Sequence, residues 1–315
     1  MWGLACITKS ILNNYSSQSI SYVLDSQYLE WNTTFPAIFV CPIAGSSSTR
    51  TSGDKGKIDE NVGKFVYEST KRVNCDYNTT MEKLCEELDH DALMSAYYEL
   101  NVSNVIEDVS FLGARLSVQD TFKFKRTQIG PCFVASQYDV SMGTTFDKLL
   151  KFNRTTGPGS FKFLLKKKAT IFILPPEAIP LLNTESALKL SILNKNHEAV
   201  FTTREIWNDR ALFRRSPEKR LCRFPNEVET PLKPFGAYSL NSCQQECMNR
   251  LEMTVANCTT HLMPEIFRKN YCGYKGLQVI SELPSFNFEE QGITCRCLRS
   301  CYDFDYEVLI DADIP

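Results

Sequence analysis

The sequence predicts a disulfide-rich α+β protein. Three observations support this: thirteen unevenly spaced cysteines, stretches of both helical and strand periodicity, and six glycosylation sequons. A chain of 315 residues is long enough for one large domain with its own core. Hydrophobic residues make up 43% and charged residues 23%, the balance of a folded protein. The net charge of −2 gives no indication of a nucleic-acid partner.

The cysteines are concentrated in one part of the chain. Eight of the thirteen lie between Cys222 and Cys301. Such a cluster indicates zinc in a reducing compartment and disulfides in an oxidising one. The sequons, which begin at Asn14, Asn32, Asn78, Asn101, Asn153 and Asn257, favour an extracellular location. The C-x3-C and C-x-C-x3-C spacings also differ from the C-x2-C of common zinc sites. We therefore expect disulfides, with no metal and no cofactor.

Several short segments have the pattern of strands. Residues 19–25 alternate with period two, and 35–41 form an apolar run that begins with Phe35-Pro36. Further strands are expected at 160–165, at 169–174 and at 306–310. The lysines at 166–168 then form a solvated turn, and 45–57 has the composition of a surface loop.

Helical periodicity appears in two main regions. Residues 64–100 carry leucines at helical spacing among acidic residues, and 239–253 repeat Leu and Cys at intervals of three to four. A shorter helix is expected at 211–215, before Ser216-Pro217.

The spacing of four cysteines indicates a stiff element. Cys243 and Cys247 share one face of the predicted helix, about 6 Å apart. Cys295 and Cys297 share one face of an extended segment, about 6.6 Å apart. Two pairs with matching spacing can form consecutive rungs of a disulfide ladder, because a disulfide tolerates Cα separations of about 4.4–6.8 Å. Such a ladder suits the transmission of force better than catalysis.

The N-terminal segment 1–12 is apolar but does not have the pattern of a cleavable signal peptide. No stretch reaches the roughly 20 apolar residues of a membrane-spanning helix. We expect residues 1–12 to be the outer end of a helix that begins upstream.

Three motifs resemble the epithelial sodium channel/degenerin family. Phe35-Pro36-Ala37, followed by Ile-Phe-Val-Cys, is similar to that family's F-P-A-[VI]-T-x-C signature, with Phe39 where Thr is usual. Ser216-Pro217-Glu218, continuing to Phe224, resembles the S-P-E-x-R-x-C-R-F of its insect pickpocket branch. The run from Cys295 to Cys301 resembles C-x-C-L-P-S-C. The resemblance covers residues 1–310.

The resemblance implies a channel ectodomain with a central palm/β-ball sheet, a helical finger and a disulfide-laddered helical thumb. A truncated first transmembrane helix would occupy 1–12 and one extracellular domain 13–315. Within that domain, the palm/β-ball strands would lie at 19–41, 132–215 and 302–315, the finger at 60–131 and the thumb at 222–301. The second transmembrane helix, which carries the family's selectivity filter, is expected to be absent from this chain.

A disulfide map also follows from the resemblance. The implied bonds are Cys222–Cys301, Cys243–Cys297, Cys247–Cys295, Cys258–Cys272, Cys41–Cys132 and, less directly, Cys75–Cys85. This map leaves Cys6 as a membrane-buried thiol. One family bond in the thumb is missing at both ends, because Ala256 replaces one cysteine and none follows Cys272 before Cys295.

By this resemblance the chain is a subunit of a ligand- or mechanically gated, amiloride-sensitive type of sodium channel in the plasma membrane. Its partners would be sodium ions, the membrane and related subunits in a homo- or heterotrimer. The alternative is a secreted or truncated, non-conducting binding protein. An enzyme is not expected, since no catalytic motif occurs. His90, His197 and His261 are interpreted as ordinary surface or loop residues, which gives little support for a pH sensor.

Overall fold

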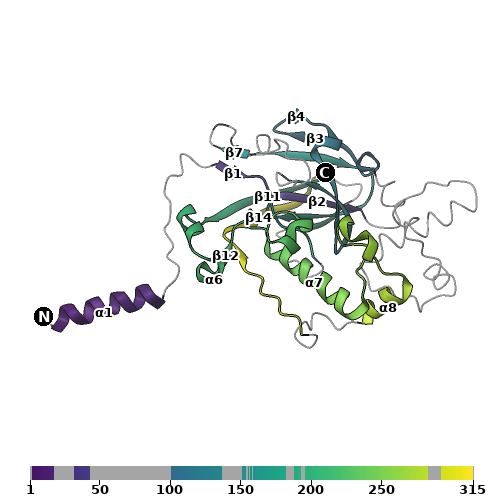
Figure 1. Ribbon diagram of the computed structural model, residues 1–315. Helices are drawn as coiled ribbons and strands as arrows, with labels where there is room; N and C mark the ends of the chain where they lie inside the picture. The colour runs from purple at the N-terminus through teal and green to yellow at the C-terminus, as the bar shows by residue number, and fades with distance from the viewer. Residues whose placement is uncertain are drawn as a thin grey trace, which may run out of the picture.

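The computed structural model describes residues 2–17, 32–42, 101–136, 151–153, 155, 157, 159–181, 188–192, 196–282 and 292–314. Figure 1 shows a group of β-sheets with helices α7 and α8 packed together on one side. The expected strand at 19–25, the loop at 45–57 and the helix at 64–100 lie outside the described residues.

The central sheet has five antiparallel strands in the order β10-β9-β2-β6-β5. They span Leu188–Ile192, Ala169–Leu174, Ala37–Pro42, Gly130–Ala135 and Lys123–Thr127, respectively. All six residues of β2 are buried. Because side chains alternate along a strand, Ile38 and Val40 join one apolar cluster while Phe39 and Cys41 join another on the opposite face. The F-P-A segment therefore forms the middle of the core, and Pro36 precedes the strand, where its missing N–H costs nothing.

A second sheet, in the order β4-β3-β8, covers one face of the central sheet. Its strands are β3 (Ile106–Phe111), β4 (Ala114–Arg115) and β8 (Phe161–Leu165), with η2 (Val102–Asn104) and α5 (Val118–Thr121) beside them. Phe35 is at the centre of the aromatic contacts here, with ring centroids 5.8 Å from Phe111 and 5.1 Å from Phe161. Such pairs contribute about 0.5–1.5 kcal/mol each beyond area burial.

Two further pairs complete the strands. The long antiparallel ribbon of β11 (Asn196–Trp207) and β14 (Tyr302–Ile314) packs on the central sheet through Phe304, Tyr306 and Ile173. A short pair joins β1 (Asn32–Thr34) to β7 (Lys151–Asn153).

The cysteine-rich part of the chain contains helices α7 and α8, which pack beside the sheets. Its elements are β12 (Cys222–Arg223), η5 (Thr230–Phe235), α7 (Leu240–Ala256), η6 (Glu265–Asn270), α8 (Tyr274–Glu282) and β13 (Arg299–Ser300). Before them lie η4 (Arg210–Arg214) and α6 (Pro217–Arg220). The Ser239 hydroxyl caps α7 by accepting a hydrogen bond from the backbone N–H of Ser242. In return, the Ser242 hydroxyl accepts one from the backbone N–H of Ser239. This reciprocal cap fixes where the helix begins.

Helix α1 (Trp2–Ser17) carries an exposed apolar stripe. Leu4, Ile7, Ile11 and Leu12 are each more than 60% exposed. Within the described residues, we find no helix with both the length and the apolarity needed to cross a membrane.

The structure corrects one prediction. Residues 101–131, which the resemblance placed in a helical finger, contain strands β3, β4 and β5, and only the short η2 and α5 are helical there. A register shift in β3 between Ile106 and Asp108 lets Ile106 and Val109 both be buried. His261 lies in a turn, as expected of a loop residue, but it is buried, with only 3% of it exposed.

Candidate functional site

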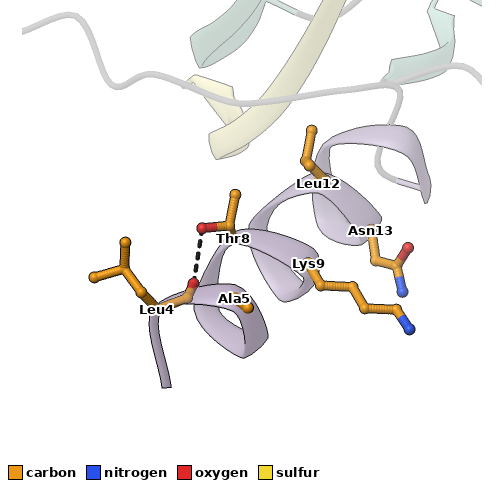
Figure 2. A pocket seen from close by; sticks show the side chains of 6 residues that line it. All are labelled: Leu4, Ala5, Thr8, Lys9, Leu12 and Asn13. Atoms are coloured by element: carbon orange, nitrogen blue, oxygen red, sulfur yellow. Dashed lines mark hydrogen bonds between the residues drawn. The ribbon is translucent and has the colours of Figure 1, made fainter. Parts of the chain in front are cut away.

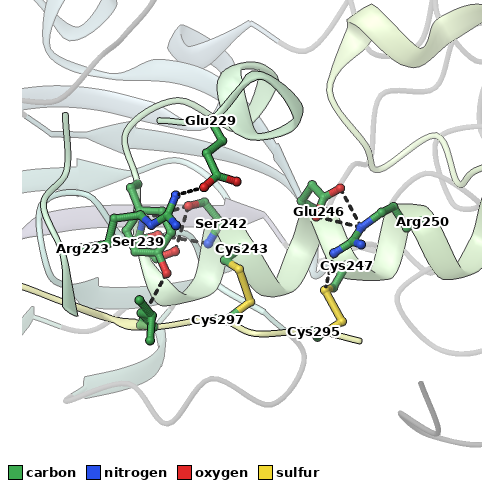
Figure 3. Close-up of a disulfide and its surroundings, with 12 residues drawn as sticks. Arg223, Glu229, Ser239, Ser242, Cys243, Glu246, Cys247, Arg250, Cys295 and Cys297 are labelled. Carbon is green, nitrogen blue, oxygen red and sulfur yellow. Dashed lines mark hydrogen bonds and ion pairs between the residues drawn. A yellow bond between two sulfur atoms is a disulfide. The ribbon is translucent and has the colours of Figure 1, made fainter. Parts of the chain in front are cut away.

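The four ladder cysteines are bonded in two successive rungs between α7 and an extended segment (Figure 3). Cys243 bonds to Cys297 with Cα atoms 5.7 Å apart, and Cys247 bonds to Cys295 with Cα atoms 6.0 Å apart. Cys243 and Cys247 lie one helical turn apart, and their partners lie two residues apart in extended chain. The segment is thereby held along about one turn of α7.

Two further bonds close the ends of the cysteine-rich region. Cys222 bonds to Cys301 where β12 and β13 pair in parallel, and β14 begins at the next residue. Cys258 bonds to Cys272 beyond the C-terminal end of α7. Gly276 of α8 packs on this second bond, because a Cβ there would lie 2.3 Å from the Cys258 sulfur. Only glycine fits that approach without a shift of the helix.

Arg220 organises the entry to the cysteine-rich region. Its guanidinium donates to the carbonyl oxygens of Cys222 at 2.9 Å and Arg215 at 3.0 Å, and it pairs with Glu227. The Arg220 side chain is only 1% exposed. It also lies 4.8 Å from the ring centroid of Phe224, which is fully buried. One side chain therefore fixes several backbone segments around the Cys222–Cys301 bond.

A second arginine holds the extended ladder segment through an aromatic ring. Arg223 lies 5.2 Å from the ring centroid of Tyr238 and pairs with Glu229. The Tyr238 hydroxyl donates to the carbonyl oxygen of Leu298 at 2.6 Å, next to Cys297. Figure 3 shows Arg223 and Glu229 on the side of the first rung, that of Cys243 and Cys297.

Three polar contacts join the cysteine-rich region to the central sheet and the turn after β9: Arg126–Tyr271, Asn241–Ile179 and Ser300–Glu177. The guanidinium of Arg126, in β5, donates to the Tyr271 hydroxyl at 2.6 Å, across 145 residues of sequence. The Tyr271 hydroxyl in turn donates to the carbonyl oxygen of Met263 at 2.8 Å. Asn241, in the first turn of α7, donates to the carbonyl oxygen of Ile179 at 2.7 Å. These directed bonds fix the orientation of α7 and its surroundings relative to the central sheet.

The third contact involves a buried carboxyl group that sequence reasoning missed. Ser300 donates to Glu177 at 3.3 Å, in the turn that follows β9. Burial raises the pKa of the Glu177 carboxyl to about 7. Glu252, on α7, is also buried, and burial raises its pKa to about 7 although it accepts bonds from Thr259 and Thr260. Glu177 is the single charged residue of the apolar run 169–182, which is a local signal that sequence reasoning did not use. Glu252 lies on the predicted helix 239–253, where helical periodicity alone did not indicate its burial.

The raised pKa of Glu252 predicts a stability that decreases with pH. The pKa of a glutamate in the unfolded chain is about 4.5, so between that pH and about 7 the folded chain binds more protons than the unfolded chain. The free energy of unfolding should therefore fall as pH rises through this window and level off above it. Glu252 should contribute a loss on the order of 2–3 kcal/mol between pH 5 and pH 8.

Urea unfolding of the parent chain and of Glu252→Gln at both pH values checks this. Glutamine keeps an oxygen acceptor for Thr259 and Thr260 but does not titrate, so the variant should lose the Glu252 part of the pH dependence. An unchanged pH dependence in Glu252→Gln would contradict the prediction.

The predicted glycosylation sites lie on several elements. Asn101 is exposed, and its side chain accepts from the Ser103 N–H at 3.0 Å. Asn257 is exposed and ends α7 in the left-handed conformation, with φ 54°. Asn32 and Asn153 face each other across the β1–β7 pair, and Asn14 lies in α1. Asn78, like Cys75 and Cys85, falls outside the described residues.

The remaining predicted residues are placed as follows. Cys41 bonds to Cys132 between adjacent strands β2 and β6, and Cys6 is a free, exposed thiol on α1. His197 lies in β11. Within the described part of the chain, no three His, Cys, Asp or Glu side chains are grouped as a metal site.

A hollow beside α1 does not qualify as a ligand site (Figure 2). Its lining consists of Leu4, Ala5, Thr8, Lys9, Leu12 and Asn13. All six belong to one helix, so the hollow is an open surface of α1 with no wall from any other element.

Comparison with known proteins gives one positive result. The family model described as amiloride-sensitive sodium channel matches residues 1–315. A search of curated proteins gives no match.

Proposed function

Because the chain belongs to the amiloride-sensitive sodium channel family, we propose that its cysteine-rich region, residues 222–301, transmits the energy of an external stimulus toward a sodium pore. Membership of this family makes the chain a sodium channel subunit in general terms. Proteins of this family are ion channels and not enzymes. They are sodium-conducting trimers of the plasma membrane with an extracellular domain.

One observation above all supports a transmitting role: the rigid connection of the disulfide ladder to β14. The ladder segment passes from Cys295 through Cys297 to Cys301, and β14 starts at Tyr302. A displacement of α7 would therefore pass into the long β11–β14 ribbon without a flexible linker between them. A stimulus that favours one position of α7 would bias the equilibrium between closed and open channels.

We assign the remaining parts by the same resemblance. Residues 222–301 would be the thumb, the central sheet the palm and β-ball, and α1 the outer end of a membrane helix. The exposed stripe Leu4, Ile7, Ile11 and Leu12 supports the last assignment, since lipid would cover it. The motif at 216–224 supports the insect pickpocket branch, and trimers with identical or related subunits are both compatible with it.

Sodium current measured in cells that express the chain with related sodium-channel subunits tests this proposal. Tyr271→Phe removes the hydroxyl that joins Arg126 to the Met263 carbonyl and leaves the ring in place. The loss of a buried hydrogen bond costs about 1 kcal/mol. If the closed and open channels differ in how much of that bond they keep, the loss shifts the equilibrium between them, and we expect at least about a twofold change in amiloride-sensitive current per subunit at the cell surface.

Tyr306→Phe is the matched control. It deletes a buried hydroxyl that has no hydrogen-bond partner among the described residues, so the current per surface subunit should stay unchanged. If both substitutions changed the current equally, or if neither changed it, the role of the Arg126–Tyr271 contact would be refuted. Co-assembly with related subunits and no current in any combination would instead identify a non-conducting regulatory relative.

A further inference from the structure

The second rung of the ladder has a charged neighbour. The guanidinium of Arg250 donates to the sulfur of Cys247 at 3.1 Å (Figure 3). Arg250 lies one turn after Cys247 on α7, and its Nε is held by the Glu246 carboxylate at 2.9–3.0 Å. The Glu246 side chain is 9% exposed and the Arg250 side chain 49%. Arg250 is thereby anchored at the helix surface with its Nη2 directed at the Cys247 sulfur.

The two cysteines of this rung differ in exposure to solvent. Cys247 is only 1% exposed, whereas Cys295 on the outer segment is partly exposed. A thiolate from solution can therefore reach Cys295 more easily than Cys247. Attack at Cys295 expels the sulfur of Cys247 as the leaving group.

The contact of Arg250 favours that leaving group. A neighbouring guanidinium stabilises a thiolate over the neutral thiol, and a better-stabilised thiolate leaves a disulfide faster. A hydrogen bond to a charged acceptor is also stronger than one to a neutral sulfur. Arg250 therefore stabilises the product of exchange more than it stabilises the intact bond.

The first rung is an internal reference. Cys243 and Cys297 are both partly exposed, so a thiol has access to this bond too. Among the described residues, however, no arginine or lysine donates to either of its sulfurs. The two rungs thus differ in the charged donor while they share one helix and one partner segment.

We propose that the Cys247–Cys295 bond is a redox modification site that exchanges with small extracellular thiols, with Arg250 as its positioning residue. The attacking thiolate forms a new S–S bond to Cys295, the Cys247–Cys295 bond breaks, and its electron pair goes to Cys247 as a thiolate held by Arg250. A second thiolate then attacks the sulfur of the first thiol in the mixed disulfide. The two external thiols leave as a symmetrical disulfide, and Cys295 is released as a thiolate. The rung ends as two thiols, and the two electrons come from the pair of external thiols. The Cys243–Cys297 rung stays closed and keeps the segment against the start of α7.

Kinetics of partial reduction of the 315-residue chain test this. The chain is treated with a monothiol such as 2-mercaptoethanol at pH 7.5, quenched at intervals, alkylated and digested with trypsin. Arg296 separates Cys295 from Cys297, so the two rungs are followed in different peptides. We expect Cys295 to react about three to ten times faster than Cys297, with the mixed disulfide on Cys295 and the alkyl group on Cys247 in the first product.

Three variants separate the effect of the Arg250–Cys247 contact from that of general charge and from that of exposure. Arg250→Gln should bring the two rates together, and Arg250→Lys should keep part of the difference. Lys269→Gln makes the same change of charge at an exposed position of η6 and should leave the ratio unchanged. Equal rates in the parent chain, a ratio that Arg250→Gln does not change, or the same effect from Lys269→Gln would each overturn the proposal.

Discussion

Replacement of Arg220 by methionine is expected to lower the free energy of unfolding by about 3–5 kcal/mol. The substitution removes the donors to the carbonyl oxygens of Cys222 and Arg215 and leaves Glu227 without its cation. The buried carbonyl group of Cys222 and the partly buried one of Arg215 would lose their partners, and the loss of a buried partner costs about 1–3 kcal/mol. Methionine fills much of the volume, so the loss would report polar contacts more than a cavity. Denaturant unfolding of the oxidised chain measures this change.

The double variant Arg220→Met/Glu227→Gln makes the prediction specific. Neutralising Glu227 removes the unpaired charge that the single substitution leaves, so the double variant should regain about 1–2 kcal/mol. The matched control is Arg223→Met, because Arg223 is also paired with a glutamate but its partner Glu229 is 63% exposed. This control should cost about 1 kcal/mol or less from its ion pair, as exposed pairs contribute little. A similar cost for Arg220→Met and Arg223→Met would show that Arg220 is not the organising residue.

The first rung gives the second large effect. Cys243→Ser alone leaves Cys297 as an unpaired thiol beside the two sulfurs of the second rung, with which it can exchange. We expect this single variant to be recovered as folded, oxidised protein in several-fold lower yield, with mispaired species visible on non-reducing gels.

The paired variant Cys243→Ser/Cys297→Ser should be less damaging than either single change. With the Cys247–Cys295 bond intact, the first rung closes only a small additional ring of about eight residues, so the chain-entropy model assigns it about 2–3 kcal/mol, against about 4 for an isolated loop of this length. Denaturant unfolding of the purified paired variant measures that cost. Equal and additive damage from the two single changes would contradict the pairing.

The ladder was accessible from the sequence because its signal is local. An interval of four on a helix and of two in extended chain places Cys243 and Cys247, and likewise Cys295 and Cys297, on common faces regardless of the rest of the fold. The helix itself was predicted at 239–253 and runs from Leu240 to Ala256. The run 35–41 was predicted as a strand for the same kind of reason and forms β2.

The contacts between the helices and the sheets could not be predicted from local spacing in the sequence. Arg126 and Tyr271 are 145 residues apart, and nothing in either neighbourhood indicates the other. Burial of Glu252 depends on tertiary packing, whereas Glu177 is the single charged residue of the apolar run 169–182, a local signal that was not used. The strands at 101–131 were missed because the bounds of the finger were taken from the family resemblance, while helical periodicity was found only at 64–100.

The order of the cysteine bonds gives the region a simple topology. The bonds Cys258–Cys272, Cys247–Cys295, Cys243–Cys297 and Cys222–Cys301 span 14, 48, 54 and 79 residues, and each encloses the one before it. No bond crosses another, as in the base pairs of a nucleic-acid stem. The bonds can therefore close from the inside outward, each over a short additional loop, without threading the chain through a closed ring.

The same nesting determines what a protease can do. A cut between Cys272 and Cys295 would leave both new ends attached through the Cys258–Cys272 bond and the two rungs. Segments of the chain between those cysteines can also change in length without moving the entry at Cys222 away from the exit at Cys301. The outermost bond thus fixes the entry and the exit of the region next to each other, whatever the length of the chain between them.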